Sequence, residues 1–313
     1  MNNITPIILD MDPGIDDAVA LSIALTHPAI DIKLLTSVAG NVSVDKTTNN
    51  LLKLTTFFNK TNVPVASGAS APLKKPFVDA SYIHGKSGMP GYDFPQVTAK
   101  TLPVDATTAM AQVLSMSPEP MTIVATGSYT NIALLIQQHP ELLKQIKQFV
   151  LMGGSLSGGN VSSVAEFNVF TDPDAADIVF KSGVPIVMIG LDVTLKALLP
   201  LKTIDNVAHI GESGSMLQKL MTAYGDSEPG GKPMHDVNTI CYLLKPEFYT
   251  TKDYWVDVIT NGPAAGATIA DTQNRWSNGK VNAKVAVDID VQAFENWFLE
   301  QIPVMNQSRE GAI

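Results

Sequence analysis

Short apolar runs alternate with helical patterns along most of the chain. The pattern predicts a first strand that begins at Ile7 and further strands over 31–38, 63–66, 121–125, 149–152 and 185–192. It predicts helices over 18–25, 47–58, 105–117, 132–138 and 173–182, and two helical stretches within 201–224. A strand that ends in a turn and leads into a helix is half of a βαβ unit. This order therefore predicts an α/β fold with a doubly wound, mostly parallel sheet. No Pro/Gly/Ser-rich linker divides residues 1–313, which favours a single domain.

Three later segments depart from this alternation. Residues 68–101 hold many of the prolines and glycines, and a structureless stretch of this length is usually functional. This stretch contains His84, although a lone loop histidine is more often a surface residue. Residues 225–233 form a flexible loop that is a candidate lid. The last part predicts strands over 255–259 and 284–290 and a closing helix over 291–301.

The first strand and the turn after it carry four aspartates, Asp10, Asp12, Asp16 and Asp17. Like charges this close raise one another's pKa and cost stability, and a bound cation would relieve the repulsion. Because the local donors are all oxygen atoms, the cation should be Ca²⁺ or Mg²⁺ rather than Zn²⁺. The alternative is a solvated acidic turn in which Asp16 or Asp17 caps the following helix.

Further polar residues follow other predicted elements. Asn41 comes just past the second strand, as a partner of the acidic turn or simply as a turn former. Glu166 and Asn168 would face the same way in extended backbone, as a clamp for hydroxyl groups or as a polar strand edge. His235 and Asp236 stand at a helix N-terminus, where the dipole depresses a histidine pKa and favours a carboxylate. The alternatives there are a surface histidine and a helix cap.

The composition excludes several kinds of partner. The chain has 313 residues, 45% hydrophobic, with a formal charge of −9 and no Lys/Arg cluster, which argues against nucleic acid and anionic membranes. Residues 1–6 lack the basic segment of a signal peptide, and no apolar run is long enough to span a bilayer. The single cysteine, Cys241, permits no internal disulfide, so a reducing cytoplasm is the expected location.

Together these motifs resemble the nucleoside hydrolases of the inosine-uridine preferring type. The resemblance is carried, in order along nearly the whole chain, by residues 10–18, 38–41, 84–85, 126–131, 152–154, 165–168 and 234–236. Residues 38–44 and 84–94 are most similar to the bacterial broad-specificity ribonucleoside hydrolases of subtype C. The resemblance implies a Rossmann-like nucleoside hydrolase fold. It also implies hydrolysis of the N-glycosidic bond of purine and pyrimidine ribonucleosides, as in nucleoside salvage.

The same resemblance implies a Ca²⁺ cofactor and a mechanism. The ion would be held by Asp12, Asp17, Asp236 and the backbone carbonyl of Thr126, with Asp12 acting as general base on a metal-bound water. His235 would donate a proton to the leaving base. A homodimer or homotetramer is expected.

Contacts to the substrate are implied for a further set of residues. Asp16, Asn41, Asn160, Glu166 and Asn168 would bind the ribose hydroxyls, Met152 would lie beneath the sugar, and His84 and Tyr224 would assist near the base. Two positions depart from the family pattern. Ser128-Tyr129 replaces the usual Pro-Leu, which could shift the turn that carries Thr126. Met11 replaces the usual Thr or Cys between the first two aspartates, where side chains alternate.

Two other functions compete with this one. Asp10-Met11-Asp12 also occurs in Mg²⁺-dependent phosphatases of the haloacid dehalogenase type. That class has Thr or Val two places after the second aspartate, where this chain has Gly14. A non-catalytic nucleoside- or ribose-binding protein is the third possibility, but it would need no general base and would be expected to carry an export signal.

Overall fold

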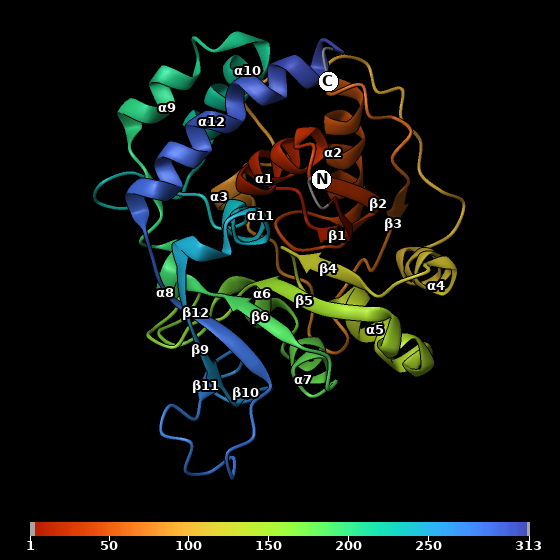
Figure 1. Cartoon of the computed structure of the whole chain (residues 1–313), viewed down its shortest axis with the longest axis vertical. Helices are drawn as coiled ribbons and strands as arrows, with labels where there is room; N and C mark the ends of the chain where they lie inside the picture. Colours follow the sequence, from red (N-terminus) through yellow and green to blue (C-terminus); the bar gives the residue numbers. More distant parts are fainter. Residues whose placement is uncertain (1–3, 312–313) are drawn as a thin grey trace.

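The computed structural model describes residues 4–311 and is built around one eight-stranded sheet (Figure 1). The strand order is β3-β2-β1-β4-β5-β6-β12-β9, and neighbouring strands are parallel except for the antiparallel pair β12 and β9. The strands are β1 Thr5–Met11, β2 Ile30–Ser37, β3 Val65–Ser67, β4 Met121–Ala125, β5 Ile146–Met152, β6 Ile186–Ile189, β9 Tyr249–Tyr254 and β12 Ala283–Ile289. The predicted α/β fold with a mostly parallel sheet is confirmed.

Helices cover both faces of the sheet, as the apolar strands require. They are α1 Ile15–Thr26, α2 Val44–Phe57, α3 Ser81–His84, α4 Ala106–Met116, α5 Thr130–Gln138, α6 Phe167–Thr171, α7 Pro173–Phe180, α8 Leu191–Thr194, α9 Leu201–Val207, α10 Gly211–Ala223, α11 Val237–Leu244 and α12 Val291–Arg309, with 3₁₀ turns η1 Pro140–Gln145 and η2 Pro246–Phe248. Helices α1, α2 and α10 to α12 lie over one face, and α4, α5 and α7 lie over the other (Figure 1). Side chains of β1 alternate between the two cores, with Leu9 in the first and Ile8 in the second.

Two short antiparallel ribbons stand beside the main sheet. They pair β7 Leu198–Leu199 with β8 Lys232–Pro233, and β10 Val256–Val258 with β11 Thr268–Ala270. The first ribbon ties the end of the candidate lid, residues 225–233, to the segment after α8. The lid is therefore anchored at its C-terminal end.

Several predicted elements differ in extent from those of the structure. The closing helix continues past residue 301 to Arg309 although it contains Pro303, because Ile302 before the proline and Met305 after it bury apolar side chains. The strand predicted over 185–192 ends at Ile189, and the short helix α8 follows. The irregular stretch 68–101 contains the single helical turn α3.

The carboxyl ends of β2, β1, β4 and β5 lie next to one another at one edge of the sheet. Ligands of open α/β sheets bind at this edge. Over the part of the chain that the structure describes, no helix is both long and apolar enough to cross a membrane. Residues 1–3, which begin the segment that lacks a signal-peptide pattern, and residues 312–313 lie outside the described residues.

Candidate active site

The first strand carries a buried aspartate that supports the site from within the fold. Asp10 accepts hydrogen bonds on Oδ1 from the hydroxyl of Thr36 (2.6 Å) and the side-chain amide of Asn131 (2.8 Å). Burial raises the pKa of Asp10 to about 7. These bonds join β1 to β2 and α5, so Asp10 braces the ends of neighbouring elements and is not among the residues that line the pocket.

Asp12 lies just past β1, fully buried between two adjacent turns. Its Oδ2 accepts the backbone amide of Asn41 at 2.7 Å, whereas Oδ1 has no hydrogen-bond partner among residues 4–311. A Cβ atom at Gly40 would overlap Oδ2, and one at Gly127 would lie 2.9 Å from Oδ1. The two glycines therefore leave room for this carboxylate. An unpartnered buried oxygen is what a bound cation or an ordered water would satisfy.

Asp17 connects the first turn of α1 to two other elements. One carboxylate oxygen accepts the amide of Gly14 (2.9 Å) and the side-chain amide of Asn41 (3.0 Å), and the other accepts the hydroxyl of Thr126 (2.7 Å). Asn41 also donates to the carbonyl of Asp12 at 3.1 Å, so it links the two aspartates. The predicted position of Asn41 beside the acidic turn is confirmed.

Asp236, from a distant part of the chain, lies close to the neighbouring carboxylates of Asp16 and Asp17. Asp16, Asp17 and Asp236 are all buried, and each has a carboxylate oxygen within 4.8 Å of the others. Burial raises the pKa of Asp12, Asp17 and Asp236, and the neighbouring carboxylates raise it further; for Asp17 the pKa is about 7. The acidic turn is not solvated, because these groups are withdrawn from water, but Asp17 does cap α1 as that alternative expected, by accepting the amide of Gly14.

Glu166 stands where a turn passes into a helix, on the opposite side of the pocket. Its carboxylate accepts the backbone amides of Asn168 (2.8 Å), Val169 (3.2 Å) and Gly154 (2.8 Å). Glu166 is thus the N-cap of α6, which begins at Phe167. The extended backbone expected here is wrong, since a helical turn gains this cap. Burial raises the pKa of Glu166 despite the three amides.

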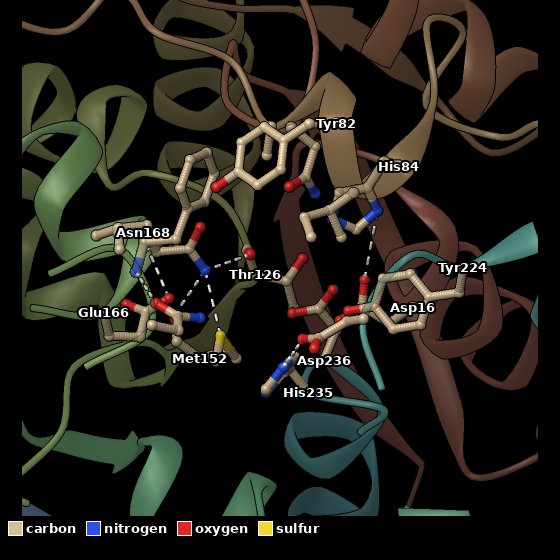
Figure 2. A pocket seen from close by; sticks show the side chains of 17 residues that line it. Asp16, Tyr82, His84, Thr126, Met152, Glu166, Asn168, Tyr224, His235 and Asp236 are labelled. Carbon is tan, nitrogen blue, oxygen red and sulfur yellow. Dashed lines mark hydrogen bonds and ion pairs between the residues drawn. The ribbon is translucent and has the colours of Figure 1, made fainter. Parts of the chain in front are cut away.

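Asn168 brings together the ends of β4 and β5. Its side-chain amide donates to the carbonyl of Thr126 at 2.7 Å and to that of Met152 at 3.2 Å, and it lies 3.2 Å from the Met152 sulfur (Figure 2). Asn160 accepts the amide of Phe167 at 3.0 Å. Asn160, Met152, Glu166 and Asn168 all line the pocket, so these four predicted substrate contacts share one wall.

His235 precedes α11, and both of its ring nitrogens are engaged. Nδ1 lies 2.7 Å from the hydroxyl of Thr194, and Nε2 lies 3.2 Å from Oδ2 of Asp226. Burial lowers the pKa of His235, but the hydrogen bond to Asp226 and the charges of Asp16 and Glu166 outweigh burial and raise it overall. The expected depression by the helix dipole is therefore wrong in direction, because carboxylates surround the ring.

His84 and Tyr224 form the wall next to Asp16 (Figure 2). Their rings lie 5.2 Å apart and are tilted by 41°. Nδ1 of His84 accepts the backbone amide of Ile15 at 3.1 Å, which assigns the neutral ring's proton to Nε2. Burial lowers the pKa of His84, so the neutral form is favoured. His84 is thus a buried site residue rather than the surface histidine that a loop position suggests.

These walls surround one open pocket. Of the residues predicted from the sequence, the pocket is lined by Asp16, Asn41, His84, Thr126, Met152, Asn160, Glu166, Asn168, Tyr224, His235 and Asp236. Asp12 and Asp17 lie below this surface. The close carboxylate group contains Asp16, predicted to bind ribose, and does not include Asp12, predicted to bind metal.

Sequence reasoning missed several lining residues, among them Ile83, Val161, Phe167, Tyr82 and Asp226. Tyr82 is 72% exposed and stands at the pocket mouth, two residues before His84 (Figure 2). Asp226 lies in the candidate lid, two residues after Tyr224. Their proximity to predicted site residues was the signal available, but no residue pattern indicated that their side chains face inward.

The fold is that of the nucleoside hydrolases. The sequence matches the family described as inosine-uridine preferring nucleoside hydrolase over residues 7–296, and the chain belongs to this family. It is a ribonucleoside hydrolase, an enzyme of the class that the motifs predicted. The two competing functions, a Mg²⁺-dependent phosphatase and a non-catalytic nucleoside- or ribose-binding protein, are not favoured.

Individual relatives support this assignment. The chain is 47% identical over 299 residues to the non-specific ribonucleoside hydrolase RihC of Klebsiella pneumoniae, covering 95% of this chain and 98% of the relative. It is 46% identical over 296 residues to RihC of Salmonella typhimurium, covering 94% and 96%. Among solved structures, the purine-preferring ribonucleoside hydrolase of Gardnerella vaginalis superposes with a TM-score of 0.89 at 33% identity, covering 96% and 99%.

Proposed function

We propose that this enzyme hydrolyses both purine and pyrimidine ribonucleosides to free base and ribose, with Ca²⁺ as its cofactor. The observation that carries the proposal is the buried group of carboxylates, two of which line a pocket that is also lined by His84 and His235. The relatives named non-specific ribonucleoside hydrolase support the broad substrate range.

The donor set fits a hard cation. Every candidate ligand atom is an oxygen, three carboxylates converge, and Oδ1 of Asp12 has no partner among the described residues. The residues that would hold the ion are Asp12, Asp17, Asp236 and the carbonyl of Thr126. Bound Ca²⁺ would neutralise the repelling carboxylates, hold the ribose diol and make a water molecule more acidic.

Asp12 would act as the general base. Its Oδ1 is free to accept a proton from the water that attacks C1′ of the ribose, while the amide of Asn41 fixes Oδ2. The Asn41 contact thus holds the Asp12 carboxylate in one orientation.

The ribose would lie between the two walls of the pocket. Asp16, Asn41, Asn160, Glu166 and Asn168 would bind its hydroxyls above Met152. The transition state of glycoside cleavage carries positive charge on the sugar ring. A buried carboxylate such as Glu166 would stabilise that charge. A 2′-deoxy sugar would leave some of the polar groups that bind the ribose hydroxyls without a partner, so the site would discriminate against it.

His235 would protonate the leaving base. Thr194 and Asp226 hold its ring, and the surrounding carboxylates favour the protonated form. His84 and Tyr224 would contact the base, with the Nε2 proton of His84 available as a neutral donor. A base that leaves as a neutral molecule departs more easily than an anion.

The direct test is incubation of the enzyme with uridine and with inosine in the presence of Ca²⁺, measuring free base and free ribose. Both products should appear in equal amounts from both nucleosides, and Asp12→Ala should abolish turnover and weaken calcium binding. Phosphate release from a phosphoester without nucleoside cleavage would favour a phosphatase. Binding of nucleosides without turnover would favour a binding protein, and near-normal turnover by Asp12→Ala would remove Asp12 from the mechanism.

We further propose that the enzyme is a cytoplasmic homodimer or homotetramer. The free, buried thiol of Cys241 is consistent with a reducing compartment. Light scattering coupled to size-exclusion chromatography tests the subunit number, and a monomer at micromolar concentration would contradict it.

A further inference from the structure

Tyr129 does not line the pocket but lies beneath one of its walls, the one that is proposed to contact the ribose and contains Met152 and Asn168. It follows β4 at the start of α5 and is only 1% exposed. Its hydroxyl donates a hydrogen bond of 2.8 Å to the carbonyl of Met152, the last residue of the neighbouring strand β5. The bond therefore joins the carboxyl ends of two adjacent strands directly under a predicted sugar contact.

The turn after β5 is shaped around this hydroxyl. A Cβ atom at Gly153 would overlap the Tyr129 hydroxyl oxygen, and Gly153 has a φ of 154°. The next amide, of Gly154, donates to Glu166 at 2.8 Å. The turn is thus held from one side by Tyr129 and from the other by a residue of the pocket wall.

The carbonyl of Met152 also connects Tyr129 to Asn168. Asn168 donates to this carbonyl at 3.2 Å and to the carbonyl of Thr126 at 2.7 Å (Figure 2). Without the Tyr129 hydroxyl, Asn168 would be the remaining side-chain donor to Met152. A shift of Asn168 toward that carbonyl would draw it away from Thr126. The Tyr129 hydroxyl thereby determines how the side-chain amide of Asn168 is shared between the carbonyls of Thr126 and Met152.

The preceding residue makes a similar link on the other side. The hydroxyl of Ser128, also buried, donates to the carbonyl of Ala39 at 3.2 Å, two residues before Asn41. The pair that departs from the family pattern thus connects the ends of β2, β4 and β5. The Thr126 amide donates to the carbonyl of Asp10 at 3.0 Å, which ties this turn to β1.

We propose that Tyr129 is a positioning residue for the ribose subsite, acting through the Met152 carbonyl on Met152 and Asn168. This inference rests on the proposed function, since it assigns the sugar to that wall. Small displacements of positioning groups cost much in rate, because the reacting geometry is narrow. A buried hydroxyl that touches no substrate can therefore contribute to sugar binding.

The test is Tyr129→Phe, which removes the hydroxyl and keeps the ring. We expect kcat/KM for uridine to fall about tenfold, mainly through a higher KM, and product inhibition by ribose to weaken by a similar factor. Inhibition by the free base should not change. The matched control is Tyr249→Phe, which removes another buried hydroxyl, one that donates to the carbonyl of Asn238 at 3.1 Å. Tyr249→Phe should lower the melting temperature about as much as Tyr129→Phe does, but it should change neither kcat/KM nor inhibition by ribose.

A rescue variant separates positioning from loss of folding. p-Aminophenylalanine at position 129 restores a donor at the same place and should recover ribose inhibition and KM toward wild type. The inference is overturned if Tyr129→Phe matches wild type in KM and ribose inhibition, or if the amino variant folds and binds ribose no better than Tyr129→Phe. A wild-type enzyme that releases no ribose from uridine or inosine would instead refute the proposed function.

Discussion

Nε2 of His235 lies 3.2 Å from Oδ2 of Asp226, a residue of the 225–233 loop. Because Thr194 occupies Nδ1 at 2.7 Å, the ring cannot rotate without losing a partner. One ring nitrogen therefore faces a carboxylate that a loop movement could withdraw. The contact couples the candidate lid to the residue proposed to protonate the base.

His235→Ala should slow the chemical step far more than it weakens sugar binding. Loss of a general acid typically costs about 10²- to 10⁴-fold in rate. Single-turnover rates on inosine measure the chemical step, and product inhibition by ribose measures the sugar subsite. An unchanged turnover rate on inosine would remove His235 from the mechanism.

Asp226→Asn should lower kcat on inosine about tenfold, since a hydrogen bond to a charged group contributes roughly 1.5–3 kcal/mol. The amide keeps the shape of the side chain but not its charge. Glu228→Gln is the control, because Glu228 lies in the same loop and does not line the pocket. Equal rates for wild type and Asp226→Asn would show that the carboxylate serves only the loop.

The sequence predicts the parts of this site that belong to strand-end turns. Asp12, Asn41 and Thr126 follow strands that the apolar runs indicate, and neighbouring parallel strands must end at the same edge. His235 and Asp236 likewise stand at the N-terminus of a helix that the sequence predicts. The order of strands and helices along the chain is enough to infer these positions.

Other features depend on tertiary contacts that leave no local pattern. Thr194 lies 41 residues before His235 in the chain, and no spacing rule links them. Glu166 looks like part of a strand until its amide partners, including the distant Gly154, are known. The raised pKa of His235 depends on charges from three separate segments, so the local helix dipole gave the wrong sign.

Removal of calcium should destabilise the protein as well as inactivate it. Buried carboxylates repel one another, and a ligand at about 100 times its Kd stabilises the folded state by about 2.7 kcal/mol. Differential scanning calorimetry in a calcium chelator and in excess Ca²⁺ should show a melting temperature that is roughly 2–4 °C higher with the ion. In Asp236→Asn this difference should shrink, and a difference as large as in wild type would place the ion elsewhere.

Cys241 should resist thiol reagents while the protein is folded. Burial raises the pKa of this thiol to about 12, so the reactive thiolate is scarce at neutral and mildly alkaline pH. In the unfolded chain the thiol titrates near its ordinary value, and labelling with Ellman's reagent becomes fast. Stoichiometric labelling of the native enzyme within seconds at pH 8 would contradict this burial.

Gly40→Ala should act on the enzyme through Asp12. The backbone of Gly40 does not need a left-handed conformation, so alanine is allowed there, but its methyl group would overlap Oδ2 of Asp12. The carboxylate cannot simply move aside, because its Oδ2 accepts the backbone amide of Asn41 at 2.7 Å and a shift would break this hydrogen bond. We expect an unfolding free energy lower by about 1–3 kcal/mol. We also expect kcat/KM to fall on the order of 100-fold, because the general base is displaced.

The background variant Asp12→Ala tests that cause. Where the Asp12 carboxylate is absent, the added methyl group has nothing to overlap, so Gly40→Ala should cost little further stability. Urea unfolding of the wild type, both single variants and the double variant gives the coupling free energy between the two positions. Gly40→Ala could instead lower the unfolding free energy equally in both backgrounds. Glycine would then be needed for the conformation of the turn, and Gly40 would not be what orients the Asp12 carboxylate.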